Sequence, residues 1–131
     1  ATLVCTPHQG ELVGMGGPNA DDRKQLADGV AEFAADLGHT LLVKGARDII
    51  SDGETTRISR TGNPGMTVGG TGDVLAGVVG ALLATEPPRA AAAVGAYVTG
   101  RAGDLAADAV GDSLVATDLL DRLPEAFVTD E

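Results

Sequence analysis

The chain has 131 residues, a hydrophobic fraction of 44% and a formal net charge of -10, from 19 acidic and 9 basic residues. This length is enough for one domain with a sizeable core, and the acidic balance disfavours a surface that recruits nucleic acid or anionic lipid by charge. The single cysteine, Cys5, excludes an intrachain disulfide, and no apolar stretch is long enough to cross a bilayer. We therefore expect a cytoplasmic protein that binds neither nucleic acid nor a membrane.

The charged and aromatic residues are unevenly chosen. Lys24 and Lys44 are the two lysines, and the aromatic residues are Phe33, Tyr97 and Phe127. Because salt screens the repulsion among many carboxylates, we interpret this bias as halophilic adaptation. The alternative interpretation is that the net charge only keeps the protein soluble.

The first part of the chain alternates between apolar segments and loops. Residues 2–6 form a short apolar run that predicts a buried strand. Apolar residues then recur at helical spacing between a cap at Asn19 or Asp21 and a stop at Gly38, which predicts an amphipathic helix. Residues 40–43 predict a second buried strand.

A hairpin signal comes next. Asp52 and Gly53 lie between residues 48–51 and 55–59, and an Asp-Gly pair between two such runs favours a tight turn. The middle of the chain is therefore predicted to be β-rich.

Helical patterns fill the remainder. A Gly-rich loop precedes an apolar helical pattern that opens at Asp73. Residues 89–108 predict a second, Ala-rich helix, and residues 117–123 predict a third, capped by Thr117 or Asp118. Strands first and helices last indicate a layered α/β architecture.

The Gly-rich loop carries the clearest chemical signal. Around Gly70, Thr71 and Gly72, backbone N–H groups can converge on an anion, and the following helix adds the positive end of its dipole. The segment lacks the Gly-Lys-Ser/Thr of a Walker loop, and Leu75 stands where a dinucleotide fingerprint has its third glycine. The sequence predicts a phosphate site of another class.

Asp73 follows this loop and allows two interpretations. A carboxylate in the first turn of a helix commonly does no more than stabilise the helix dipole. Alternatively, Asp73 is a general base that takes a proton from a substrate hydroxyl lying against a phosphoryl group.

Four segments carry a resemblance to one family. They are residues 6–12 (TPHQGEL), 43–46 (VKGA), 63–66 (NPGM) and 70–77 (GTGDVLAG). With these motifs in this order, the chain closely resembles the NAD(P)H-hydrate dehydratase family of the ribokinase-like, or carbohydrate kinase, superfamily. Weaker similarity in the last third extends the resemblance over nearly the whole chain.

The resemblance implies a fold and an activity. The fold would be a three-layer α/β/α arrangement with a mostly parallel sheet, of which residues 1–131 would form the C-terminal part, about half of the domain. The activity would be dehydration of the damaged cofactors NADHX and NADPHX to NADH and NADPH, with ADP or ATP as co-substrate and Mg²⁺ as cofactor. In many microbes the same polypeptide also carries an N-terminal epimerase domain. Whether the protein forms a homo-oligomer is left open.

The resemblance also assigns residues. His8 and Asp73 would face the hydrated nicotinamide, with Asp73 as the catalytic base. Backbone amides of the phosphate loop, residues 70–72, would stabilise the charge on the transferred group. No metal ligand is assigned. The residues that would line the nucleotide site are Lys44, Gly45, Ala46, Arg47, Asp48 and Gly72.

Other interpretations of these residues remain. Without the family, His8 would be an exposed or hydrogen-bonded histidine at a strand end, and Lys44 could form a surface ion pair. The sequence departs from the family at Gln9, usually proline, and at Val68, usually a small residue; neither change removes a reacting group.

Two other functions stay open as well. A small-molecule kinase of the same superfamily would share the Gly-Thr-Gly-Asp segment, and a non-catalytic nucleotide-binding fragment would keep the loop without turnover. Product analysis separates the three.

Overall fold

The computed structural model describes residues 1–128, and its centre is a four-stranded sheet in the order β1-β2-β3-β4. The strands are β1 (Val4–Cys5), β2 (Thr40–Val43), β3 (Ile49–Ser51) and β4 (Thr56–Ile58). β1 and β2 are parallel, whereas β2–β3 and β3–β4 are antiparallel. The acidic end at residues 130–131 lies outside the described residues.

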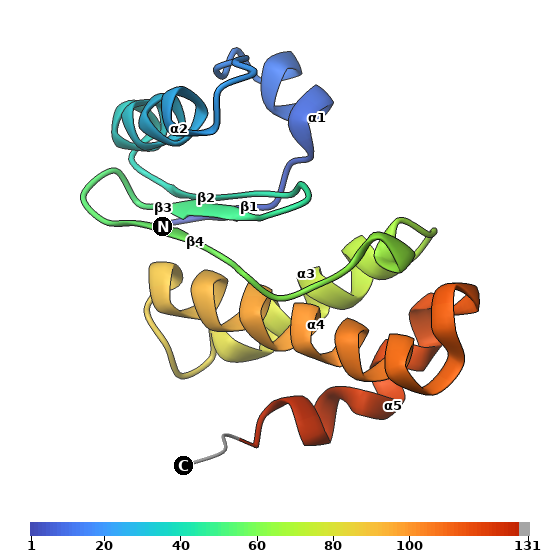
Figure 1. Cartoon of the computed structure of the whole chain (residues 1–131). Coiled ribbons are helices and arrows are strands. Elements are labelled where there is room, and N and C mark those ends of the chain that lie inside the picture. Colours follow the sequence, from blue (N-terminus) through green and yellow to red (C-terminus); the bar gives the residue numbers. More distant parts are fainter. Residues whose placement is uncertain (129–131) are drawn as a thin grey trace.

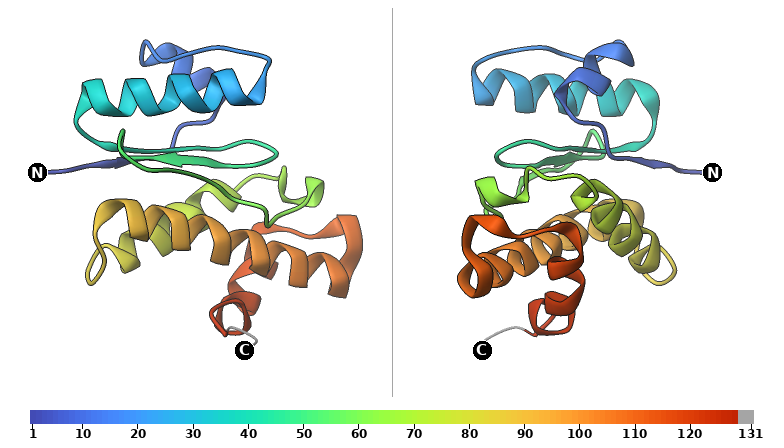
Figure 2. Two further views of the ribbon diagram at one scale, coloured as in Figure 1. Left: turned by 60° about the vertical axis from the view of Figure 1, so that its left-hand side comes forward. Right: turned by 90° about the vertical axis from the view of Figure 1, so that its right-hand side faces the viewer.

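Helices cover both faces of this sheet, which gives three layers (Figure 1). α1 (Gln9–Gly14) and α2 (Arg23–Leu37) lie on one face, and α3 (Thr71–Leu82) and α4 (Pro88–Val110) lie on the other (Figures 1 and 2). α5 (Ala116–Ala126) packs against α4 on the side away from the sheet. The expected α/β/α layering is confirmed.

β2 shows why the sheet needs helices on both sides. All four of its residues are buried, and successive side chains point to opposite faces. Leu41 and Val43 pack against α2 through Val30 and Ala34. Leu42 packs on the other face, in a cluster that is made up of Ile50, Leu75, Val79, Ala92 and Ala96.

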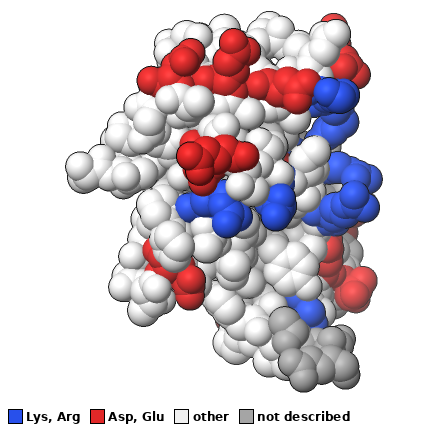
Figure 3. Space-filling model, turned by 90° about the vertical axis from the view of Figure 1, so that its left-hand side faces the viewer, with Lys and Arg blue, Asp and Glu red and all other residues white. Residues whose placement is uncertain are grey.

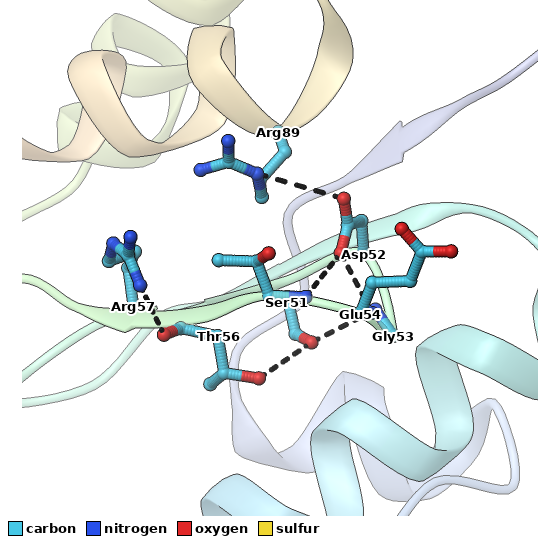
Figure 4. Close-up of polar contacts among 8 residues, drawn as sticks. Ser51, Asp52, Gly53, Glu54, Thr56, Arg57 and Arg89 are labelled. Carbon is cyan, nitrogen blue, oxygen red and sulfur yellow. Dashed lines mark hydrogen bonds and ion pairs between the residues drawn. The ribbon is translucent and has the colours of Figure 1, made fainter.

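The predicted hairpin is present, and Asp52 organises its turn (Figure 4). The Asp52 carboxylate accepts hydrogen bonds from the N–H groups of Glu54 at 2.9 Å and Thr55 at 2.8 Å. Arg89 Nε lies 3.7 Å from the other carboxylate oxygen. The backbone hydrogen bonds to Asp52 therefore hold the turn together, and the contact with Arg89 links it to the first turn of α4.

The strand directions correct one expectation. One strand pairing of the described sheet is parallel and two are antiparallel, so the mostly parallel sheet that the resemblance implied does not hold for this part of the chain. The connections at residues 44–48 and 52–55 are far shorter than the crossover of about a dozen residues that parallel strands require.

Helix boundaries also differ from the predictions. α2 is capped by Asp22, whose carboxylate accepts from the Gln25 N–H at 3.1 Å, and not by Asn19 or Asp21. α3 begins two residues before Asp73, at Thr71.

α5 begins earlier than predicted, at Ala116, with Val115 as the cap residue in place of Thr117 or Asp118. Asp118 still acts at this helix end, because its carboxylate accepts from the Val115 N–H at 2.7 Å. In the described part of the chain, none of the helices combines the length and the hydropathy that a membrane span requires.

Candidate functional site

A cavity of about 530 Å³ opens where β1 and β2 end. His8 follows β1 and Lys44 follows β2, and the two residues pair as a parallel bridge in which the Lys44 N–H donates to the Pro7 carbonyl at 2.9 Å. Ligands of open α/β sheets bind at the carboxyl ends of the strands. The cavity therefore lies at the edge of the sheet where this fold class holds its ligands.

The N-terminus of α3 forms one wall of the cavity. The Thr71 hydroxyl donates to the carbonyls of Met66 at 2.9 Å and Val68 at 3.1 Å, which fixes the preceding loop. The Lys44 ammonium lies beside Gly72, because a Cβ at Gly72 would stand 3.1 Å from Lys44 Nζ. Free N–H groups at a helix start together with an ammonium make a site for an anion.

Asp48 adds a carboxylate to the same cavity. Its Oδ1 accepts from the Gly45 N–H at 3.1 Å. Burial raises the pKa of Asp48 above its usual value, while the Gly45 hydrogen bond and the nearby Lys44 oppose that shift. This carboxylate is thus partly desolvated and lies close to a cation.

His8 lines the cavity and also caps α1. Its Nδ1 accepts from the Glu11 N–H at 3.1 Å, and the Glu11 carboxylate accepts from the His8 N–H at 3.0 Å. That second bond is the main reason why the pKa of Glu11 lies below its usual value. The His8 side chain is exposed, and its Nε2 lies 3.3 Å from Glu11 Oε1.

Asp73 lies elsewhere. Its side chain is exposed and lines an apolar groove of about 580 Å³ between α3 and α5, next to Val74, Leu123 and Phe127. It is adjacent in sequence to Gly72, which lines the cavity. Gly72 and Asp73 are thus consecutive residues in the first turn of α3, one lining the cavity and the other lining the groove.

The structure brings together six of the predicted site residues and leaves four outside the cavity lining. The lining includes His8, Lys44, Gly45, Asp48, Thr71 and Gly72. Gly70 precedes α3 with φ +95°, a conformation that favours glycine, and Ala46 and Arg47 are exposed in the loop after Lys44.

Sequence reasoning missed how α4 holds the loop over the cavity. The Asp104 carboxylate accepts from the Gly62 N–H at 3.1 Å and from Asn63 Nδ2 at 2.9 Å. Gly100 and Gly103 allow the close approach, since a Cβ at Gly100 would overlap Thr61 and one at Gly103 would overlap the Met66 side chain. Two glycines and an aspartate on one side of a helix were the available signal.

The donor set does not form a metal cage. Within residues 1–128, no group of three or more His, Cys, Asp or Glu side chains could hold a metal ion. Mg²⁺ commonly binds through phosphate oxygens and waters with one or two carboxylates, and Asp48 is a carboxylate in the cavity lining.

Three comparisons place the chain among known proteins. The family model described as NAD(P)H-hydrate dehydratase matches residues 1–125. The chain is 48% identical over 126 residues to the "Bifunctional NAD(P)H-hydrate repair enzyme Nnr" of Methanospirillum hungatei, and covers 26% of that protein with 95% of its own length. It is 43% identical over 126 residues to the "ADP-dependent (S)-NAD(P)H-hydrate dehydratase" of Cenarchaeum symbiosum, with 95% of this chain and 44% of the relative covered.

A solved structure extends the comparison to three dimensions. The ADP/ATP-dependent NAD(P)H-hydrate dehydratase of Bacillus subtilis, co-crystallized with ATP/Mg²⁺, superposes with a TM-score of 0.85 at 32% identity. The match covers 96% of this chain and 47% of that chain. The chain thus spans between about a quarter and half of the length of the proteins that it matches.

Proposed function

Because the chain belongs to the NAD(P)H-hydrate dehydratase family, we propose that it carries the nucleotide site and the catalytic base for dehydration of NAD(P)HX to NAD(P)H at the expense of ADP or ATP. The match to the Bacillus subtilis dehydratase also bears out the ribokinase-like fold. The observation that carries the proposal is the anion site formed by Lys44 and the start of α3 in the lining of the 530 Å³ cavity, a volume within the usual range of small-molecule sites.

The nucleotide would lie in the 530 Å³ cavity with its phosphates at the start of α3. N–H groups of Thr71 and Gly72 and the Lys44 ammonium would offset the phosphate charge. Local positive groups are needed because the chain as a whole carries a formal charge of -10. Bound Mg²⁺ would be held mainly by phosphate oxygens and would offset charge on the transferred group, with Asp48 as the carboxylate within the cavity.

The chemistry would proceed at the start of α3. Asp73 takes the proton from the hydroxyl of the hydrate, and the oxygen forms a bond to the terminal phosphorus as the bond to the departing nucleotide breaks. The phosphate ester then leaves by elimination, with loss of a proton from the neighbouring carbon. Because Asp73 is exposed and directly follows Gly72 in the first turn of α3, the hydrate would bind against this turn, between the Asp73 carboxylate and the terminal phosphate in the cavity.

The proposal also concerns a longer protein of which this chain would be a part. The relative from Methanospirillum hungatei is named bifunctional and is covered to 26%, which supports the expectation of a further catalytic domain. That this domain is an epimerase stays a prediction. The 44% and 47% coverage of the two dehydratases supports the expectation that residues 1–131 are part of a longer dehydratase domain, and their place at its C-terminal end stays a prediction.

The substitution Asp73→Asn tests the catalytic base. We expect loss of NADHX turnover with ADP affinity nearly unchanged, because the amide keeps the shape and cannot take the proton. Turnover is followed by the appearance of NADH, and ADP binding by calorimetry. Asp121→Asn, an exposed aspartate of α5, is the matched control.

The products distinguish the remaining functions. Formation of AMP, phosphate and NADH from ADP and NADHX identifies a dehydratase. A stable phosphorylated alcohol would identify a kinase, and ADP binding without turnover by the wild-type chain would identify a nucleotide-binding fragment. Near-normal turnover of Asp73→Asn would refute the role of Asp73.

A further inference from the structure

Four threonines line the cavity, and one of them stands apart. The hydroxyls of Thr61, Thr67 and Thr71 each donate to a backbone carbonyl, those of Tyr97, Pro64 and Met66 respectively. The Thr99 hydroxyl is shielded from water and has no hydrogen-bond partner within residues 1–128. A buried hydroxyl without a partner is destabilising, so such groups are rare and call for an explanation.

Thr99 lies on α4 among apolar neighbours in the cavity lining. The residue is 3% exposed, and Leu75 and Ala96, which also line the cavity, are 4% and 2% exposed. Gly100 follows Thr99 and presents no side chain. This part of the cavity thus offers an apolar surface with one hydroxyl.

The hydroxyl can reach a ligand through a small adjustment. Threonine in a helix populates two χ1 rotamers, and a rotation of about 120° between them moves the hydroxyl to a different side of the residue. Thr99 lines the cavity while its hydroxyl is shielded, so a contact with a bound ligand requires the rotamer that turns the hydroxyl towards the cavity. A hydrogen bond to an acceptor or donor of the ligand would offset the free-energy cost of this rotation.

The cavity has a polar and an apolar part. Lys44 and Gly72 form the part that suits phosphates, and Leu75 and Ala96 form a part that suits a flat ring. A hydroxyl can donate or accept, which fits the nitrogen-bearing edge of a nucleobase. We infer that Thr99 is a specificity-determining residue whose hydroxyl bonds the nucleobase of the nucleotide that the start of α3 holds by its phosphates.

This inference rests on the proposed function, and isosteric variants test it. Thr99→Val replaces the hydroxyl by a methyl group, and Thr99→Ser keeps it. We expect Thr99→Val to weaken ADP binding about tenfold, the worth of one hydrogen bond, and to leave binding of inorganic tripolyphosphate unchanged. Thr99→Ser should bind ADP nearly as the wild type does. Affinities are measured by titration calorimetry on the whole chain.

The melting temperature of the unliganded chain is a second readout. Thr99→Val removes a buried hydroxyl that has no partner, so the melting temperature should stay the same or rise. The matched control is Thr56→Val in β4, whose hydroxyl shares a hydrogen bond of 2.9 Å with Ser51. That variant should melt at a lower temperature and bind ADP normally. A lower melting temperature of Thr99→Val with unchanged ADP affinity would show a purely structural role and overturn the inference.

The remaining outcomes separate this inference from the proposed function. Equal losses for ADP and tripolyphosphate would contradict a contact with the base. Weaker NADH binding with unchanged ADP binding would place the hydroxyl against the substrate and likewise overturn the assignment. A wild-type chain that binds neither ADP nor ATP would refute the proposed nucleotide site itself, whatever residue 99 is.

Discussion

Two aspartates four positions apart show how local surroundings set the behaviour of a carboxylate. Asp48 is half-buried in the cavity, and burial raises its pKa. Asp52 lies in a turn where backbone N–H groups donate to it, that of Thr55 above all, and these bonds lower its pKa. Burial thus disfavours the charged form of Asp48 near the ligand site. The hydrogen bonds to Asp52, by contrast, contribute to the stability of the hairpin.

The hairpin therefore predicts a pH-dependent stability. Because the pKa of Asp52 is lower in the folded chain than its ordinary value of 3.8, its contribution is present above pH 3.8 and is lost as the pH falls through the folded value. We expect Asp52→Asn to lower the free energy of unfolding by roughly 0.5–1 kcal/mol at pH 7, the excess of a charge-assisted hydrogen bond after discounting for solvent.

Urea unfolding at pH 7 and at a series of values below 3.8 provides the measurement for Asp52→Asn. The difference from the wild type should vanish at the acid end, where both side chains are neutral. Glu54→Gln, in the same turn, controls for loss of charge alone. A difference that persists unchanged into acid would argue against the hydrogen-bonded carboxylate as its source.

At the scale of elements, α4 supports both the sheet and the loop over the cavity. Its first half packs on β2 and β3 through Ala92 and Ala96, and its second half holds the loop through Asp104. The loop contributes Thr61, Asn63 and other residues to the cavity lining. The shape of the ligand site therefore depends on a helix residue that does not itself line the cavity.

Asp104→Asn tests that dependence. An asparagine offers one acceptor oxygen where the aspartate accepts two hydrogen bonds, so we expect a loss of about 1–3 kcal/mol in the free energy of unfolding. ADP affinity should fall as well, because one wall loses its support. Urea unfolding and calorimetry measure the two effects. Asp108→Asn, exposed one turn later on α4, should change neither. Unaltered ADP affinity in a destabilised Asp104→Asn chain would show that the loop holds its shape without this carboxylate.

Elements with local signals were predictable, and their boundaries less so. The hairpin followed from Asp52 and Gly53, because a turn depends on neighbouring residues. The start of α3 was placed two residues late, since its cap residue Gly70 has no side chain to give a signal. The early start of α5 has a similar cause, because Val115 makes no side-chain cap bond.

The site was predictable where a motif names its residues and not where distant segments meet. The Lys44 and Gly72 positions followed from the family motifs, and the structure places them side by side. The hydrogen bonds from Gly62 and Asn63 to Asp104 join residues 42 and 41 positions apart, and no local pattern announces such a pairing. The same holds for Thr99, whose missing partner is a property of the packed fold.

At the scale of the whole molecule, the charge is distributed unevenly. On the face that Figure 3 shows, Asp and Glu side chains form a row along the α2 side and separate patches lower down, while Lys and Arg form a band across the middle. The ion pairs Lys24–Asp28 at 2.9 Å and Arg122–Glu125 at 3.0 Å are exposed and add little stability in dilute buffer. With a formal charge of -10, repulsion among the remaining carboxylates opposes folding.

Salt should therefore stabilise the chain. We predict that the melting temperature rises as KCl is raised from dilute buffer to molar concentrations, because screening weakens the repulsion. Sucrose at matched osmolarity serves as the uncharged control. A melting temperature that is the same in dilute buffer and in molar KCl would refute the halophilic interpretation.

The layered order of the chain bears on how it folds. α3, α4 and α5 follow one another and pack mainly on their sequence neighbours, whereas β1 pairs with β2 across 36 residues, as Val4 opposite Thr40. Contacts between close neighbours form faster than contacts that close long loops. We expect the helices beneath the cavity to assemble first and the strand ends that bear His8 and Lys44 to join them late. A ligand that spans both parts would then act mainly by slowing unfolding, and would lengthen the lifetime of the native state more than it speeds its formation.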